Sequence, residues 1–258
     1  MGRNLREHFF LAMQYRVKSH SLNHRFFGLG LLRSVWQYTG KKGPLTHSAR
    51  EIGGFVKTRP ELDRPDAQIG ISLYSLTYGE DEVVPEKQPG LTLGGYFMRP
   101  QSQGEVSIRC ADPDAAPYIC ANYLAAATNR AAAISMYRWI RQLASQPALA
   151  PFIVGATTPS ADAQSDAEIL EAFKQWGGTA DHVSDTCRMG SDAESVVDPS
   201  LRVRGVSGLS VVDTSIMPTL ISGNTNAPAM AIALRAAEII AAESDTPEPA
   251  PSADLAAS

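Results

Sequence analysis

Cysteine and long apolar runs are both scarce in this sequence. Its 258 residues include three cysteines, Cys110, Cys120 and Cys187. Three thiols without CxxC or Cys/His spacing exclude a disulfide framework and a structural zinc site. The most apolar stretch, 227–242, is broken by Arg235 and Glu238 and falls short of the about 18 apolar residues of a membrane span. Since the N-terminus shows no signal or myristoylation pattern, we expect a cytoplasmic protein without a membrane span.

A glycine-rich dinucleotide-binding turn is also missing. No GxGxxG segment occurs, and the stretch Gly28-Leu29-Gly30 lacks both the third glycine and a preceding strand. We interpret that stretch as part of a helix. The content of 44% apolar residues is still enough to bury the core of one large domain or two small ones, which excludes global disorder.

Acidic residues are nearly absent from residues 1–50. This segment holds nine of the 23 Lys and Arg residues but a single acid, Glu7. The cations are dispersed among aromatic and aliphatic residues, so we predict a partly buried segment and no nucleic-acid partner. The segment also contains four of the five histidines: His8, His20, His24 and His47. Their spacing follows no recurrent ligand pattern, and we predict no metal site.

The remaining sequence alternates between extended and helical patterns. Strands that form an antiparallel sheet are predicted at 67–78, 92–98 and 105–110, and a further short buried strand at 206–212. An apolar stripe predicts a helix over 129–145, and Ser165 with Glu168 forms a capping box at the start of the next helix. The final helix is predicted over 226–242, and 243–258 has the composition of a disordered tail.

An ordered series of short blocks covers residues 182–228. The blocks are HVSDTCRMG (182–190), VDP (197–199), LRV (201–203), GV (205–206), GL (208–209), VVDTS (211–215), MP (217–218) and GNTNAP (223–228). This series resembles the C-terminal signature of the glucose-methanol-choline (GMC) oxidoreductases, which are FAD enzymes that oxidise alcohols. Weaker similarity extends to GRNLREH (2–8) and to segments within 100–124. Choline dehydrogenases and bacterial alcohol dehydrogenases are the members that the sequence resembles most.

The resemblance implies a catalytic pair. Removing a hydride from an alcohol requires a base with a pKa near neutrality and a second group that holds the oxygen. In the family pattern these roles fall on His182 as the base and Asn226 as the group at the substrate oxygen. Without the family pattern, His182 reads as a hydrogen-bonded structural histidine and Asn226 as a helix N-cap.

The resemblance also implies an FAD cofactor. Asp213, Thr214, Ala227 and Pro228 would line the flavin and its ribityl chain or pyrophosphate. Asn226, as the predicted N-cap of the final helix, would bring free N–H groups and the positive end of the helix dipole to the reduced flavin. On the residues alone, Asp213 is a polar strand end.

The expected fold is α+β, with an antiparallel-sheet substrate-binding region and flanking helices over 1–180. Residues 181–242 would supply the C-terminal strand and helix of an FAD-binding domain, followed by the tail 243–258. Because no glycine-rich unit is found, we expect the N-terminal Rossmann-like half to be absent. The chain would then be a C-terminal fragment that needs the missing FAD-binding half as a partner.

Three functions stay open at this point. The first is an FAD-dependent alcohol oxidoreductase, in which His182 takes the proton from a small-molecule alcohol and hydride passes to the flavin N5. The second is a flavin-containing hydroxynitrile lyase of the same fold, and the third is a noncatalytic remnant domain. Asp185 stands where the family has glycine and would raise the pKa of His182 if it came close. We interpret Cys187 as a small buried filler rather than a nucleophile.

Overall fold

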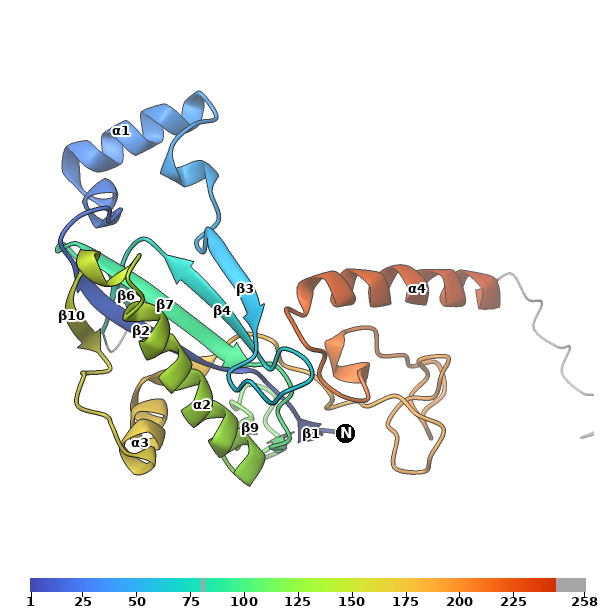
Figure 1. Cartoon of the computed structure of the whole chain (residues 1–258). Helices are drawn as coiled ribbons and strands as arrows, with labels where there is room; N and C mark the ends of the chain where they lie inside the picture. The colour runs from blue at the N-terminus through green and yellow to red at the C-terminus, as the bar shows by residue number, and fades with distance from the viewer. Residues whose placement is uncertain (80–81, 245–258) are drawn as a thin grey trace, which may run out of the picture.

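The computed structural model describes residues 1–79 and 82–244 (Figure 1). The elements, in chain order, are β1 (Arg3–Leu5), β2 (Phe9–Val17), η1 (Asn23–Phe26), α1 (Gly28–Thr39), η2 (Pro44–Thr46), β3 (Ile52–Val56), β4 (Ala67–Ser72), β5 (Leu76–Tyr78), β6 (Val83–Pro85), β7 (Gly90–Phe97), β8 (Gly104–Ser107), β9 (Tyr118–Cys120), α2 (Ala127–Ala144), η3 (Ala150–Phe152), β10 (Ile153–Thr158), α3 (Asp166–Trp176), β11 (Gly177–Thr179), η4 (Thr214–Ile216) and α4 (Asn226–Ser244).

A six-stranded antiparallel sheet forms the centre of the described residues. Its strand order is β10-β2-β7-β4-β3, and β11 pairs with the start of β2. The pairing of β4 with β7 confirms the antiparallel sheet predicted from 67–78 and 92–98. The strand predicted at 105–110 is confirmed as β8, but it is shorter than predicted and joins β1 and β9 in a separate three-stranded antiparallel sheet.

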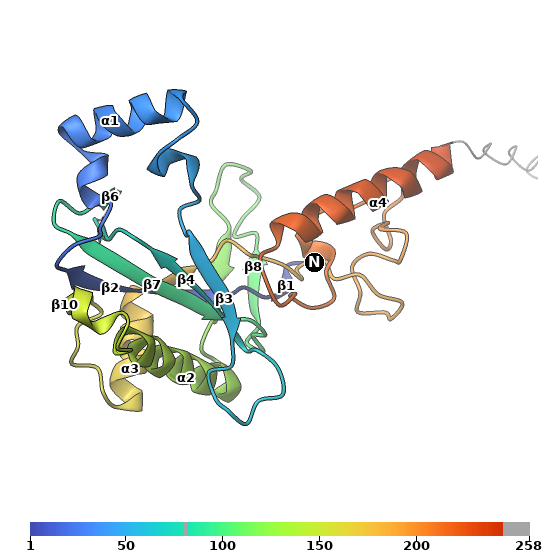
Figure 2. The same cartoon turned by 45° about the horizontal axis from the view of Figure 1, so that its top comes forward.

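The central sheet is covered by helices on one face (Figures 1 and 2). The odd-numbered residues of β2, from Phe9 to Val17, pack with α2 and α3 in one apolar cluster. Since side chains alternate along a strand, the even-numbered residues of β2 lie on the opposite face. The sheet therefore has a helix-covered face and a helix-free face.

Both predicted helices over this sheet are confirmed, and each begins close to its predicted position. The helix α2 starts two residues before the predicted 129–145 and buries Ala133, Met136 and Ile140. The helix α3 has the predicted capping box: Glu168 N donates to Ser165 Oγ at 3.3 Å, and Ser165 N donates to Glu168 Oε2 at 2.8 Å. This reciprocal cap fixes where the chain turns into α3.

The C-terminal part has its own small core, formed by Val197, Leu201, Val203, Ile216 and Ala236. The strand predicted at 206–212 is wrong. Gly205 and Gly208 have φ values of 78° and 73°, and these left-handed residues turn the backbone where a strand would stay extended. The final helix is confirmed as α4, which continues to Ser244, so the predicted disorder of 243–258 is wrong for 243 and 244. Residues 245–258 lie outside the described ones.

The basic N-terminal segment divides into a buried and an exposed part. The strand β2 is buried, but α1 extends beyond one end of the sheet while α4 lies beyond the other (Figure 2). Most of the large apolar side chains of α1, such as Leu29 and Trp36, are exposed. The helix predicted at Gly28–Gly30 is confirmed as the start of α1.

Within the described ranges, no helix is both long and apolar enough to cross a membrane.

Candidate active site

His182 is positioned by backbone pairing between two distant parts of the chain. The strand β11 pairs with β2, Ala180 N donates to His8 O at 3.2 Å, and Arg6 and Ser184 form a two-way backbone bridge. These contacts place the loop containing His182 beside the residues that precede β2. Glu7, which is buried, secures the loop further: its Oε1 accepts the His182 N–H at 2.8 Å, and its Oε2 accepts the Thr179 hydroxyl.

The imidazoles of His8 and His182 are linked in a chain of hydrogen bonds. His8 Nε2 lies 3.0 Å from Met98 O, and His8 Nδ1 lies 3.0 Å from His182 Nδ1. On the other side, His182 Nε2 lies 3.0 Å from Asn224 Nδ2. Burial lowers the pKa of His8 to about 4, so this imidazole is neutral near pH 7.

The hydrogen-bond chain assigns the tautomer of both rings. A carbonyl oxygen only accepts, so His8 must carry its single proton on Nε2 and present a lone pair at Nδ1. His182 Nδ1 must then donate to His8, which leaves the lone pair of a neutral His182 on Nε2. The pKa of His182 is lowered, chiefly by burial, and this favours that neutral form. The assignment makes Nε2 the basic atom of the site.

Asn224 is oriented by a second chain of hydrogen bonds. Tyr96 OH donates to Gln68 Oε1 at 2.5 Å, and Gln68 Nε2 donates to Asn224 Oδ1 at 3.0 Å. Burial raises the pKa of Tyr96 to about 12, which keeps its hydroxyl protonated as the donor at the start of this chain. Asn224 therefore turns its amide N–H toward His182 Nε2. The Tyr96 ring also stacks on His8, with ring centroids 4.3 Å apart.

The carboxylate that acts on His182 is Asp181 rather than Asp185. Asp181 raises the pKa of His182 and the charge of Arg50 lowers it, both to a smaller extent than burial. Asp185 is instead buried beside Arg6, with its Oδ2 3.4 Å from Arg6 Nε. Burial also raises the pKa of Asp185 itself. The expected influence of Asp185 on His182 is not seen, because the loop directs Asp185 toward Arg6.

Asn224, and not Asn226, contacts His182. Asn226 is exposed and is the first residue of α4, so its predicted place at the helix start is confirmed. The N-cap prediction is wrong by one residue, because Ala229 N donates to Thr225 O at 2.9 Å and this first helical bond makes Thr225 the N-cap. The role of Asn226 at the substrate oxygen stays a prediction.

The residues predicted to line the flavin lie in two groups. Asp213 Oδ1 accepts the Ser215 N–H at 2.7 Å at the start of η4, and Thr214 Oγ1 donates to Val183 O at 2.8 Å. These bonds join η4 to the loop that carries His182. Ala227 is exposed and Pro228 half-buried in the first turn of α4. Their contact with a cofactor stays a prediction, whereas the buried position of Cys187 is confirmed.

Sequence reasoning missed five residues of the site: Glu7, His8, Gln68, Tyr96 and Asn224. For three of them a signal was present, since Glu7 and His8 end the segment GRNLREH and Asn224 lies in GNTNAP. Gln68 and Tyr96 showed only the alternation of strands. They meet because Gln68 and Tyr96 are direct partners in the pairing of β4 with β7.

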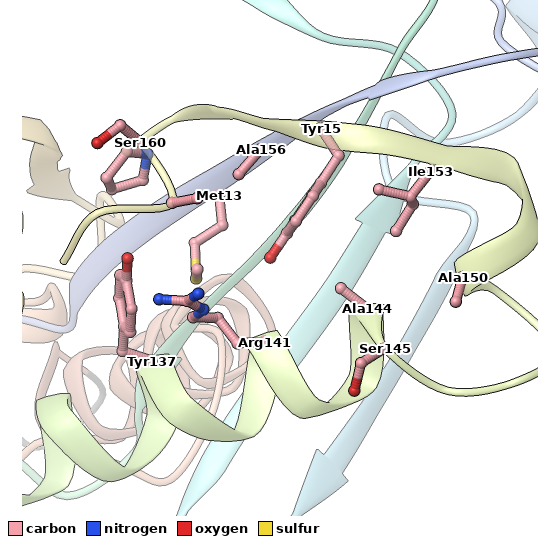
Figure 3. Close-up of a pocket in the computed structure, with 12 residues that line it drawn as sticks. Met13, Tyr15, Tyr137, Arg141, Ala144, Ser145, Ala150, Ile153, Ala156 and Ser160 are labelled. Carbon is pink, nitrogen blue, oxygen red and sulfur yellow. The ribbon is translucent and has the colours of Figure 1, made fainter. Parts of the chain in front are cut away.

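A separate cavity of about 300 Å³ opens between α2 and β10 (Figure 3). Tyr15, Tyr137 and Arg141 extend into it, and its walls include Met13 and Ile153. It lies on the helix-covered face and shares no residue with the His8–His182–Asn224 chain. Among residues 1–79 and 82–244, no group of three potential ligand side chains is placed to hold a metal ion.

Comparison with known proteins identifies the family. The family described as GMC oxidoreductase matches residues 100–233 through its C-terminal domain. The chain belongs to the GMC oxidoreductase family. It is 35% identical to an alcohol dehydrogenase [acceptor] of Pseudomonas putida over 95% of its length, and 36% identical to human mitochondrial choline dehydrogenase over 93%. It spans less than half of each relative, 45% and 41% respectively.

Two solved structures of oxidases have the same fold as this chain. An Aspergillus oryzae formate oxidase variant superposes with a TM-score of 0.83 at 23% identity, covering 94% of this chain and 47% of the oxidase. Pyridoxine 4-oxidase from Mesorbium loti gives a TM-score of 0.75 at 23% identity, covering 92% and 43%. The resemblance stated from the sequence and the mixed architecture with antiparallel sheets are both confirmed.

Proposed function

We propose that the protein containing this chain is an FAD-dependent oxidoreductase of alcohol CH–OH groups in which His182 is the base. The observation that carries this proposal is the fixed tautomer of His182, whose basic Nε2 faces the amide of Asn224. Alcohol and choline dehydrogenases among the relatives support an alcohol as the substrate class.

A hydroxyl group matches the pair formed by His182 and Asn224. A hydroxyl donates one hydrogen bond and accepts others, so it can replace the direct hydrogen bond between Asn224 Nδ2 and His182 Nε2, donating to Nε2 while it accepts from Asn224 Nδ2. His182 Nε2 then takes the hydroxyl proton as the carbon loses its hydride, and Asn224 holds the oxygen as its negative charge grows. His182 Nδ1–H stays bonded to His8 throughout, which keeps the ring oriented.

FAD, when bound, supplies the acceptor for the hydride that leaves the carbinol carbon. The described residues fit the flavin end of such a cofactor. At the start of α4 the N–H groups of Asn226 and Ala227 have no carbonyl within their own helix to bond, and both residues are exposed. Donors at a helix N-terminus suit a group that gains negative charge. These two residues would hold that group, and Thr214 would support the adjoining loop.

Anaerobic flavin reduction tests the proposal. The chain would be combined with a flavin-binding half, either as one polypeptide or in trans, and loaded with FAD. Addition of primary alcohols should bleach the oxidised flavin absorbance. A yellow protein that no alcohol bleaches would contradict the proposal, and cleavage of a cyanohydrin by that protein would indicate a lyase instead.

A further inference from the structure

The helix-free face of the central sheet adjoins His182. Residues on this face alternate with those of the apolar core, and they include Phe10, Gln68, Gly70 and Tyr96. Tyr96 contacts the rings of both His8 and His182, with centroids 4.3 and 5.3 Å apart. Any molecule with a hydroxyl at His182 Nε2 and a further extension over this face would meet those side chains.

Arg50 lies on this same face. Its guanidinium carbon is 4.2 Å from the centroid of the Phe10 ring, which is a cation–π distance. The Arg50 side chain also passes close over Gly70, where a Cβ atom would lie 2.7 Å from Arg50 Cδ. The neighbouring backbone is tied to β4, because Ser72 Oγ donates to Ala49 O at 2.7 Å. These contacts place the guanidinium on the sheet.

The charge of Arg50 has no counterion within the described residues. The adjacent Glu51 bonds to His47 instead, with Oε1 2.9 Å from Nδ1. Arg50 is nevertheless close enough to the site to lower the pKa of both His182 and Tyr96. An exposed cation that is held in place, unpaired and near the base is suited to receive an anion from a ligand.

We propose that Arg50 binds a carboxylate on the substrate, so that the preferred alcohols are hydroxy acids whose hydroxyl reaches His182. This inference rests on the proposed function, which it refines to a substrate class. The planar guanidinium can donate two parallel hydrogen bonds to a carboxylate. The Phe10 ring beneath it orients the guanidinium without neutralising its charge. Because Gly70 has no side chain, the Arg50 side chain can lie directly against the helix-free face of the sheet.

Binding measurements test the carboxylate site without any need for turnover. Calorimetry on the FAD-loaded protein would compare straight-chain carboxylates of increasing length with their primary amides. We expect saturable binding of carboxylates, weakened about 10- to 100-fold in Arg50→Gln, because charge-assisted hydrogen bonds are lost. Arg50→Lys should recover part of the affinity. Arg33→Gln, which removes an exposed arginine from α1, is the control with the same change in net charge and should bind as the unmodified protein does.

The variant Gly70→Ala separates the effect of the position of the Arg50 guanidinium from the effect of its charge. This variant keeps the guanidinium charge but displaces it through the new Cβ atom, and should weaken carboxylate binding while Arg33→Gln does not. Equal affinity for carboxylates and amides, or unchanged carboxylate binding in Arg50→Gln, would overturn the proposal.

Kinetics distinguish this inference from the proposed function. Arg50→Gln should raise the KM for hydroxy acids about tenfold or more relative to its effect on the KM for uncharged alcohols, because only the hydroxy acids lose a bond to the guanidinium. If uncharged alcohols bleach the flavin but Arg50 has no effect on hydroxy acids, the carboxylate site is refuted and the oxidoreductase stands. If carboxylates bind through Arg50 and no alcohol bleaches the flavin, the carboxylate site stands and the proposed oxidoreductase is refuted.

Discussion

Replacing His8 by alanine should slow alcohol oxidation although His8 is not the base. In the structure, His182 Nδ1–H is buried and donates to His8 Nδ1 at 3.0 Å. Without this acceptor the donor would be left unsatisfied, at a cost of about 1–3 kcal/mol. His182 can avoid that cost by moving its proton to Nε2, and it would then have no lone pair facing the substrate.

The expected loss of flavin-reduction rate follows from the cost of the unsatisfied His182 Nδ1–H. A preference of about 1.4 kcal/mol for the wrong tautomer leaves roughly one tenth of the molecules with a basic Nε2. We therefore expect flavin reduction to be about 10- to 100-fold slower in His8→Ala. His8→Asn is the matched variant, because an amide oxygen can accept from His182 Nδ1, and it should recover much of the rate.

Two measurements, with thermal unfolding as a control, test whether His8 sets the tautomer of His182. Stopped-flow absorbance gives the rate of anaerobic flavin reduction, and nitrogen chemical shifts of His182 report which ring atom carries the proton. Thermal unfolding of each variant identifies any loss that arises from unfolding, since His8 also stacks on Tyr96. A His8→Ala rate equal to that of the unmodified protein, or a proton on Nε2 in the unmodified protein, would refute the assignment.

The remaining predictions concern stability. Because burial lowers the pKa of His8 from 6.5 to about 4, the unfolded state binds its proton first as the pH falls, so stability is lost between about pH 6.5 and 4, by on the order of 3 kcal/mol. Urea unfolding at several pH values should show this loss, and His8→Asn should reduce it; an identical pH dependence in both proteins would contradict the cause. Ser165→Ala removes the cap of α3 and should cost about 1 kcal/mol in the same assay, with Ser165→Thr close to neutral. Gly104→Ala places a Cβ atom 1.9 Å from Cys120 O, so the pairing of β8 with β9 must shift and the melting temperature should fall. An unchanged melting temperature would show that Gly104 and Cys120 O lie farther apart than they do in the structure.

Local patterns in the sequence were enough to predict the helices and one ladder. Ser165 and Glu168 specify the start of α3 through contacts within four residues, and the apolar stripe that includes Tyr137 and Ile140 shows which side of α2 is buried. The strands β4 and β7 were predicted from alternation alone. The strand predicted at 206–212 failed because Gly205 and Gly208 adopt left-handed conformations that an apolar composition does not reveal.

The site was harder to predict because it depends on register between distant segments. His182 was found through its family pattern, but its acceptor His8 lies 174 positions earlier and reaches it through the pairing of β11 with β2. Gln68 and Tyr96 become neighbours only in the register of β4 with β7. A sequence shows which residues alternate along a strand, and not which strand will lie beside it.

The most direct test of the central claim is the rate of anaerobic flavin reduction by an alcohol in His182→Ala. Our account predicts a rate at least about 100-fold lower than that of the unmodified protein, since general-base catalysis contributes on the order of 10²–10⁴. It also predicts that added imidazole restores part of the rate, and that the variant binds the same amount of flavin as the unmodified protein. A His182→Ala rate within a few-fold of the unmodified protein, with no response to imidazole, would contradict the claim that His182 is the base.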